Sequence, residues 1–338
     1  MSRCEVVDRL AALSTALAVV LFTFVACAPE VPHPPTPTPP DPNSAPVTDP
    51  PQSYYLPVRG SWDLPDDIPS GRVPSEQGSI EIENLGLFGF DPREVETLRP
   101  DIFRPGHFSI FDVVAHLADR DWFSMTHHYD SRLDTHVIGE LDGRMNWWYQ
   151  AYYPGGWQEI NAFRMDMFPY KDGTTIRLST HTEAYVGRIY NSFAEELLRQ
   201  SINLGRVVIP EVRIGTTVHT NVPVSAHNVR PDVLQPGTIT ALDVLLSLAD
   251  QGKIDRMKLT WYHSIGEADP VDSLFVEQID VGDGVYDLEA SPELGEWVYE
   301  TGSRDLGGFR GSHIQIPSDV RVIVSPEYMT WYWLASPL

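Results

Sequence analysis

The amino-acid sequence predicts an α+β protein in which one folding unit occurs twice in tandem, each unit being a mixed sheet packed on one helix. Two observations predict this fold class: residues 99–119 recur as residues 230–250, and strand-like stretches precede and follow both copies. A third observation sets the units apart from the N-terminus. Residues 27–52 are dominated by proline, which favours an extended linker and cannot build a core.

The repeated segments align without a gap at an offset of 131, and ten of their twenty-one positions are identical. The identical pairs are Arg99/Arg230, Pro100/Pro231, Asp101/Asp232, Pro105/Pro236, Gly106/Gly237, Asp112/Asp243, Val113/Val244, Leu117/Leu248, Ala118/Ala249 and Asp119/Asp250. Self-similarity of this kind is typical of a duplicated structural unit. We therefore expect the same local structure in both halves.

Each copy has the pattern of a loop that leads into a helix. Ser109 and Thr240 are suitable N-caps, and Asp112 and Asp243 then stand at the third helical position, where a carboxylate complements the exposed amides. The apolar residues that follow at helical spacing are Ile110, Val113, Val114 and Leu117 in the first copy, and Leu242, Leu245, Leu246, Leu248 and Ala249 in the second. We expect both helices to bury one face.

Strand-like stretches with β-branched and aromatic residues surround each helix in the same order. They are residues 78–83, 135–138, 147–153 and 170–178 in the first half, and residues 206–214, 274–279, 284–288 and 317–324 in the second. The order strand, strand, helix, strands is that of a β-grasp. The sequence thus predicts a first β-grasp-like domain at residues 53–189 and a second at 206–338, joined by a bridging helix within residues 190–205.

The N-terminal residues are typical of a signal peptide. Arg3 and Arg9 precede an apolar run over residues 10–26 that contains no charge, and the run ends at Cys27. This ending resembles the lipobox of bacterial lipoproteins, in which the cysteine is acylated after residues 1–26 are removed. The alternative is an ordinary transmembrane anchor, for which the run is short. We expect a palmitate-bearing lipoprotein of the cell envelope, on the outer membrane or the cell surface.

Composition restricts the partners of the predicted domains. Cys4 and Cys27 are the only cysteines, so after cleavage no disulfide is expected in the domains. The formal net charge of −23 would repel phosphate backbones, and we therefore do not expect nucleic acid as a partner.

Parts of both halves resemble the transcobalamin-like C-terminal domain, a small β-grasp module of cobalamin carriers and of bacterial exported proteins. The segments that carry the resemblance are residues 109–114, 147–149 and 171–176 in the first half, and 240–245 and 319–322 in the second. These motifs are short and structural. Where the family has an Asn-Gly hairpin, this chain has residues 152–157, and the helical barrel that completes a cobalamin site is absent. The resemblance implies a fold, and no cofactor is expected.

The densest aromatic stretch is a candidate ligand-binding platform. It consists of Trp147, Trp148, Tyr149, Tyr152, Tyr153 and Trp157. Alternation along a strand would direct Trp147, Tyr149 and Tyr153 to one face and Trp148 and Tyr152 to the other. One face belongs to the core, and the other either is structural or binds a sugar, a flat ligand or a partner protein.

Two polar clusters are weaker candidates for metal binding. His127 and His128 with Asp130 and His136 have the residue types of a zinc or copper site without its spacing, which favours a solvated loop. Asp280 and Asp283, with Asp287 and Glu289, have calcium-binding side chains without the spacing of the twelve-residue calcium loop, which favours an acidic hairpin.

The sequence carries none of the common catalytic motifs, such as the Gly-x-Ser-x-Gly elbow or the phosphate-binding loop. We therefore expect a membrane-anchored binding or scaffolding lipoprotein that recognises a glycan, a small molecule or an envelope protein. Two alternatives stay open: a surface hydrolase acting on polysaccharide, and a structural subunit of an envelope complex.

Overall fold

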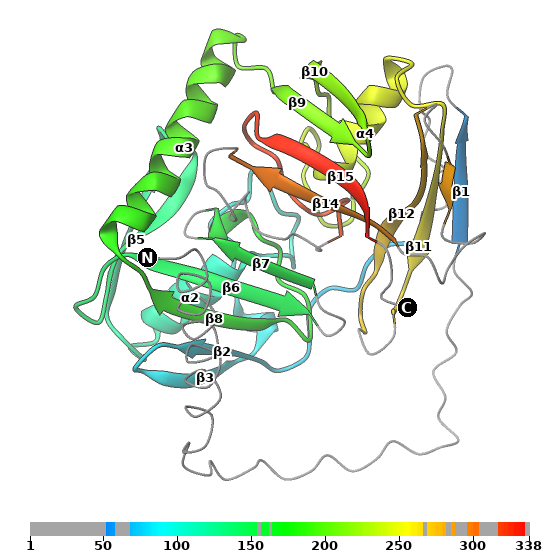
Figure 1. The fold of residues 1–338 in the computed structure, drawn as a ribbon. Coiled ribbons are helices and arrows are strands. Elements are labelled where there is room, and N and C mark those ends of the chain that lie inside the picture. The colour runs from blue at the N-terminus through cyan, green and yellow to red at the C-terminus, as the bar shows by residue number, and fades with distance from the viewer. Residues whose placement is uncertain are drawn as a thin grey trace, which may run out of the picture. The chain divides into compact units, whose positions relative to one another are not determined.

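The computed structural model describes residues 52–57, 68–153, 157–161, 164–265, 269–281, 285–287, 296–303 and 317–334. The chain divides into a unit of residues 1–48 and a unit of residues 49–338, and all described residues belong to the second. Within the described residues this unit is an α+β structure with four sheets and three α-helices (Figure 1). The predicted signal peptide, Cys27 and nearly all of the proline-rich segment lie outside the described residues.

The first half contains a five-stranded sheet with the order β3-β2-β8-β6-β7. Its strands are β2 (Gly78–Ile82), β3 (Gly86–Phe90), β6 (Trp147–Tyr153), β7 (Trp157–Asn161) and β8 (Thr175–Thr180). Strands β2 and β8 are parallel, and all other neighbours are antiparallel. Helix α2 (Ile110–Asp119) shares its core with this sheet and is followed by a separate hairpin of β4 (Met125–Asp130) and β5 (Thr135–Leu141). The 3-10 helices η1 (Pro92–Glu94) and η2 (Met165–Met167) complete this half.

The second half repeats this order of elements. Its four-stranded sheet has the order β10-β9-β15-β14, in which β9 (Val208–Ile214) and β15 (Tyr328–Leu334) are parallel. The outer strands are β10 (Thr217–Pro223) and β14 (Glu296–Gly302). Helix α4 (Ala241–Asp250) leads into β11 (Arg256–Tyr262), β12 (Ser273–Asp280) and β13 (Val285–Asp287). Both halves therefore contain a hairpin, a helix, a second hairpin, an antiparallel strand and a closing strand parallel to the first; in addition, the first half has β7 beside β6 and the second has β13 beside β12.

The helix starts predicted by the repeat are confirmed. Ser109 and Asp112 form a capping box at α2, and Thr240 and Asp243 form the same box at α4. Burial differs between the two helices, because α4 is buried at every residue from Ala241 to Ala249. The expectation that α4 would bury only one face is thus wrong. Helix α4 is buried on all sides, as a core helix is, and is not a surface helix.

Two other expectations also need correction. The bridging helix begins earlier than predicted, since α3 spans Glu183–Ile202 and is capped by the Thr182 side chain. The closing strand of the second half is β15, whereas residues 317–324 form a turn and an isolated bridge to Thr240.

Helix α3 contacts both halves. Val186, Ile189 and Phe193 pack with Leu133, which lies between β4 and β5 of the first half. Further along the helix, Glu196 accepts a hydrogen bond from Ser325 of the second half (2.7 Å). The bridging role predicted for this helix therefore has a physical basis. Among the described residues no helix is both long and apolar enough to cross a membrane.

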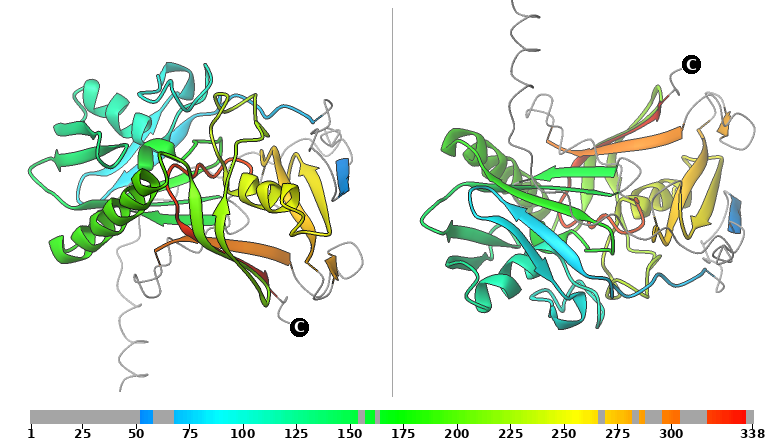
Figure 2. Two further views of the ribbon diagram at one scale, coloured as in Figure 1. Left: turned by 90° about the horizontal axis from the view of Figure 1, so that it is seen from above. Right: turned by 90° about the horizontal axis from the view of Figure 1, so that it is seen from below.

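Strand β1 (Gln52–Pro57) lies at the edge of the second half, although its place in the chain is before the first half. It pairs antiparallel with β11 in the sheet β1-β11-β12-β13 (Figure 2). Leu56 is 5% exposed and belongs to the main core. The chain that follows the proline-rich segment is thus fixed to the second half before it enters the first.

Candidate functional site

Five of the six predicted aromatic residues lie on β6, between β8 and β7 of the five-stranded sheet, and Trp157 is the first residue of β7. Trp147 and Tyr149 are buried, at 4% and 0% exposure, whereas Trp148 is half-buried and Tyr152 is 45% exposed. The expected alternation is confirmed for these four residues. The side chains of Tyr153 and Trp157 lie outside the described residues.

Trp148 is partly covered by aromatic side chains of its own chain. Its ring meets His181 edge to face at 5.6 Å, and His181 stacks on Tyr185 of α3 at 3.8 Å. Arg188 lies over the same tyrosine at 5.5 Å. This row of rings is held together by contacts within the chain, so of the four described candidates Tyr152 is the one that is clearly open to a partner.

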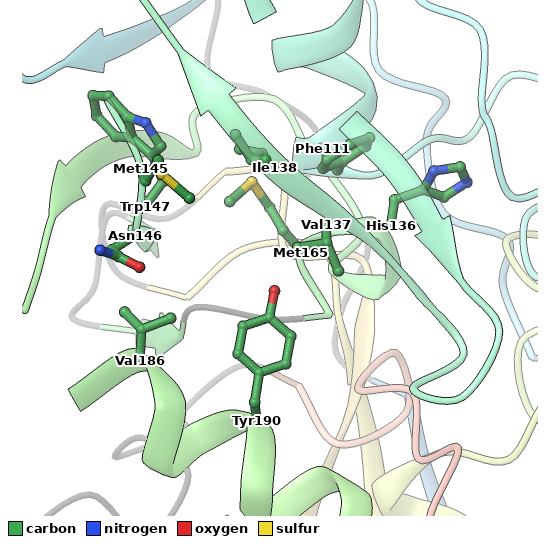
Figure 3. Close-up of a pocket in the computed structure, with 11 residues that line it drawn as sticks. Phe111, His136, Val137, Ile138, Met145, Asn146, Trp147, Met165, Val186 and Tyr190 are labelled. Carbon is green, nitrogen blue, oxygen red and sulfur yellow. The ribbon is translucent and has the colours of Figure 1, made fainter. Parts of the chain in front are cut away.

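Trp147, the first residue of β6, is one of the residues that line a pocket of about 190 Å³. Its apolar walls come from β5, from the residues at the start of β6, from η2 and from α3 (Figure 3). These walls are Val137, Ile138, Met145, Trp147, Met165 and Val186, and Phe111 lies at one end. The pocket therefore lies where the β4–β5 hairpin, the main sheet of the first half and the bridging helix meet.

Local sequence rules explain how these side chains converge. Val186 and Tyr190 are four residues apart on α3, so their side chains lie on one face of the helix. Asn146 has a left-handed backbone (φ 62°), which asparagine tolerates better than most residues and which turns the chain into β6. Met145, the residue before it, is 62% exposed while also lining the pocket, so it forms part of the rim.

The pocket is neutral. Although the chain has 47 aspartates and glutamates, none of the eleven described residues that line the pocket is Asp, Glu, Lys or Arg. The phenol of Tyr190 points into the pocket (Figure 3), and burial, reinforced by the charge of Asp130, raises the pKa of this tyrosine. Tyr190 therefore offers a neutral hydroxyl, and a charged ligand would lose its hydration without a counter-ion.

His136 lines one end of the pocket, with its imidazole directed away from Tyr190 (Figure 3). The ring stacks on Phe111 at 5.3 Å, and its buried Nδ1 has no hydrogen-bond partner among the described residues. Burial lowers the pKa of His136, although the nearby Asp166 opposes this effect. His136 is therefore neutral near pH 7 and adds no charge to the pocket.

The predicted histidine cluster is not a loop, because His127 and His128 lie on strand β4. The rings of His127 and His136 are 5.8 Å apart, and both contact Phe111. The acidic candidate Asp280 ends β12 and pairs with Val285 of β13, whereas Asp283 lies outside the described residues. Within the described part of the chain, no three His, Cys, Asp or Glu side chains are grouped closely enough to hold a metal ion.

The residues that make this pocket were only partly visible in the sequence. Trp147 and His136 were candidates for other reasons, while Val186, Tyr190, Met145 and Met165 were not identified. The spacing of Val186 and Tyr190 on a helix was the available signal, but nothing in the sequence shows which strand that helix face meets.

The fold and pocket define an α+β protein with a small neutral cavity. No family model, curated protein or solved structure matches the chain.

Proposed function

We propose that this chain is an extracytoplasmic binding lipoprotein, anchored to a membrane through acylated Cys27 and made of two β-grasp-like domains. The repeated order of elements supports the two domains, and the signal-like N-terminus supports the anchor. The observation that carries the binding function is the neutral pocket beside Tyr190. A concave, mostly apolar cavity with a few polar groups is the usual form of a small-molecule site.

The lining favours binding over catalysis. General acid–base chemistry needs a titratable group that reaches the reacting atoms, and nucleophilic chemistry needs an activated side chain. The titratable side chains of this pocket are Tyr190, whose pKa is raised, and His136, whose ring is directed away from Tyr190. The pocket is therefore suited to holding a ligand rather than to transforming it.

The anchor is tested with the Cys27→Ser variant. Labelling cells with an alkyne-tagged palmitate should mark the wild-type protein and leave the variant unlabelled. Wild-type protein should fractionate with the membrane, and Cys4→Ser should behave like wild type, because Cys4 lies in the segment that is removed. Equal labelling of wild type and Cys27→Ser would contradict the lipoprotein assignment.

The binding site is tested by filling the pocket. Val186→Phe adds volume inside it, whereas Ala194→Phe adds a ring on the exposed side of the same helix. A screen of small neutral compounds against the full mature protein in detergent should find ligands that raise the melting temperature of wild type and Ala194→Phe but not of Val186→Phe. Ligands that stabilise all three equally do not use this pocket.

Two further measurements separate the alternatives. Turnover of a polysaccharide that is lost on changing one carboxylate would favour a surface hydrolase. Stable co-purification with other envelope proteins, with no ligand that depends on Val186, would favour a structural subunit.

A further inference from the structure

We infer that the occupant of the pocket beside Tyr190 is a flat aromatic ring with one neutral hydrogen-bonding substituent, of the size of phenol or indole. This inference rests on the proposed binding function and specifies its ligand. It follows from three properties of the pocket: its volume, the chemistry of its walls and the position of its polar groups.

The volume limits the ligand to a small one. A cavity of roughly 150 Å³ is enough to hold benzene, so a pocket of about 190 Å³ holds one substituted ring or a small fused pair. Most pockets for larger ligands measure about 300 Å³ or more, so a whole sugar chain or a corrin would not fit inside.

The walls favour a ring over an aliphatic group of the same size. Met145 and Met165 contribute two thioethers, and sulfur–ring contacts are favourable by about 0.3–1.5 kcal/mol. Trp147 supplies an aromatic wall, and a well-placed pair of rings adds about 0.5–1.5 kcal/mol beyond the burial of area. A saturated ring of equal volume would gain the burial and lose both of these contributions.

The polar groups favour a single neutral substituent. The hydroxyl of Tyr190 lies within the pocket, and the carboxamide of Asn146 lies on the same side as Met145, the exposed rim residue (Figure 3). A ligand hydroxyl or N–H would hydrogen-bond to one of them. A carboxylate or an ammonium group would be buried without a counter-ion, because the described lining has no charged side chain.

The test compares ligands that differ in one property, with the full mature protein in detergent and its methionine methyl groups labelled with ¹³C. Phenol and indole should shift the methyl signals of Met145 and Met165 through their ring currents, and the signals are assigned with Met145→Leu and Met165→Leu. Met257, which is fully buried in the second half, is the internal control and should not shift. Cyclohexanol has the hydroxyl of phenol without its flat ring, and we expect it to bind at least about tenfold more weakly, because about 1.4 kcal/mol of ring contacts is lost.

Tyr190→Phe tests the polar contact, because it removes one oxygen and keeps the shape of the side chain. It should weaken phenol binding about two- to tenfold, the equivalent of one hydrogen bond, and should leave toluene binding unchanged. If N-acetyltyrosinamide binds as well as phenol, the ring belongs to a partner protein; if phenol binds and the amide does not, it belongs to a free small molecule. Both results support the aromatic ligand.

Two outcomes overturn the inference and are distinguishable from each other. If cyclohexanol binds as tightly as phenol at Met145 and Met165, the pocket binds small apolar groups without selecting a ring, and the proposed binding function stands. If no compound of any class shifts these methyl signals, and Val186→Phe behaves like wild type in the screen, the binding function at this pocket fails as well.

Discussion

Phe103 and Leu234 occupy the same position in the two sequence repeats, and they pair with each other in an antiparallel bridge. On either side of this pair, the Arg104 amide donates to the Val233 carbonyl (2.9 Å), and the Gln235 amide donates to the Ile102 carbonyl (2.8 Å). These two hydrogen bonds are themselves equivalent in the repeat. Each copy thus contacts the other through the same surface, as the subunits of a twofold-symmetric dimer do.

The equivalence extends to two buried ion pairs. The Arg99 guanidinium donates to Asp166 (2.8 Å), whose carboxylate also accepts from the His136 amide (2.9 Å). Arg230 donates to Asp319 (2.9 Å), whose carboxylate accepts from the Leu274 amide (2.9 Å). Both aspartates are 0% exposed, and each ties the start of a repeat to the strand and the turn that follow its helix.

We therefore expect Asp166→Asn and Asp319→Asn to destabilise the protein by similar amounts, about 3 kcal/mol each, because each removes the fully buried counter-ion of a buried guanidinium. Arg99 then keeps its pairs with Asp101 and Asp134, and Arg230 keeps its pair with Asp232. The unfolding free energy is measured by urea titration. Asp119→Asn, at an exposed helix end, is the control and should change it by less than about 0.5 kcal/mol. A large decrease in unfolding free energy for only one of these two aspartate variants would show that the two sites are not energetically equivalent.

The sequence predicted the repeat and its capped helices because both depend on local patterns, such as Ser109 three residues before Asp112. It did not predict β4, because His127 and His128 are poor indicators of a strand and their pairing with β5 is a contact distant in sequence. The pocket could not be predicted for the same reason. It requires Tyr190 of α3 to meet Val137 of β5, and helical spacing defines a face without identifying its partner.

The pH dependence of stability should depend in part on His227. Burial alone would lower its pKa, but hydrogen bonds to Asp243 (3.0 Å) and Asp250 (2.9 Å) outweigh burial and raise it above the ordinary value of 6.5. A folded pKa above the unfolded one means that the stabilisation is fully present below about pH 6.5 and is lost as the pH rises through the folded value.

We expect wild type to exceed His227→Gln in unfolding free energy by about 1–2 kcal/mol at pH 5.5, as for hydrogen bonds to a charged group, and by clearly less at pH 8.5. Urea titrations at the two pH values measure this difference, in which the contributions of the other histidines cancel. His128→Gln, at an exposed position of β4, is the control and should show no such change. A wild-type advantage that is the same at both pH values would contradict the charged pair.

Strand β1 should contribute to stability through Leu56, whose side chain is 5% exposed. We expect Leu56→Ala to cost about 2–4 kcal/mol, because it removes buried methyl groups and leaves a cavity beneath an edge strand. Leu87→Ala is the matched control, since it is the same substitution on the edge strand β3 at a side chain that is 72% exposed. Equal and small effects in thermal unfolding would show that β1 does not dock on β11 in solution.

The junction of the two halves contains a buried group of charges around Arg164, which is 2% exposed. Its guanidinium donates to Glu327 (2.5 Å) and to Glu196 of α3 (3.1 Å), and it lies 3.9 Å from the ring of Phe193. Burial raises the pKa of Glu196, and the charge of Arg164 opposes this effect. One arginine therefore compensates a carboxylate from the bridging helix and another from the second half.

We expect Arg164→Met to cost about 3–5 kcal/mol, because it leaves both Glu196 and Glu327 buried without this cation. Glu196→Leu should cost less, because Arg164 keeps its ion pair with Glu327. The double variant should cost less than the sum of the two, since apolar groups of similar volume often replace a buried pair at little expense. Urea titration of all four proteins gives this interaction energy as a double-mutant cycle. Strict additivity would mean that the two side chains do not interact, and that α3 is held to the second half by its other contacts.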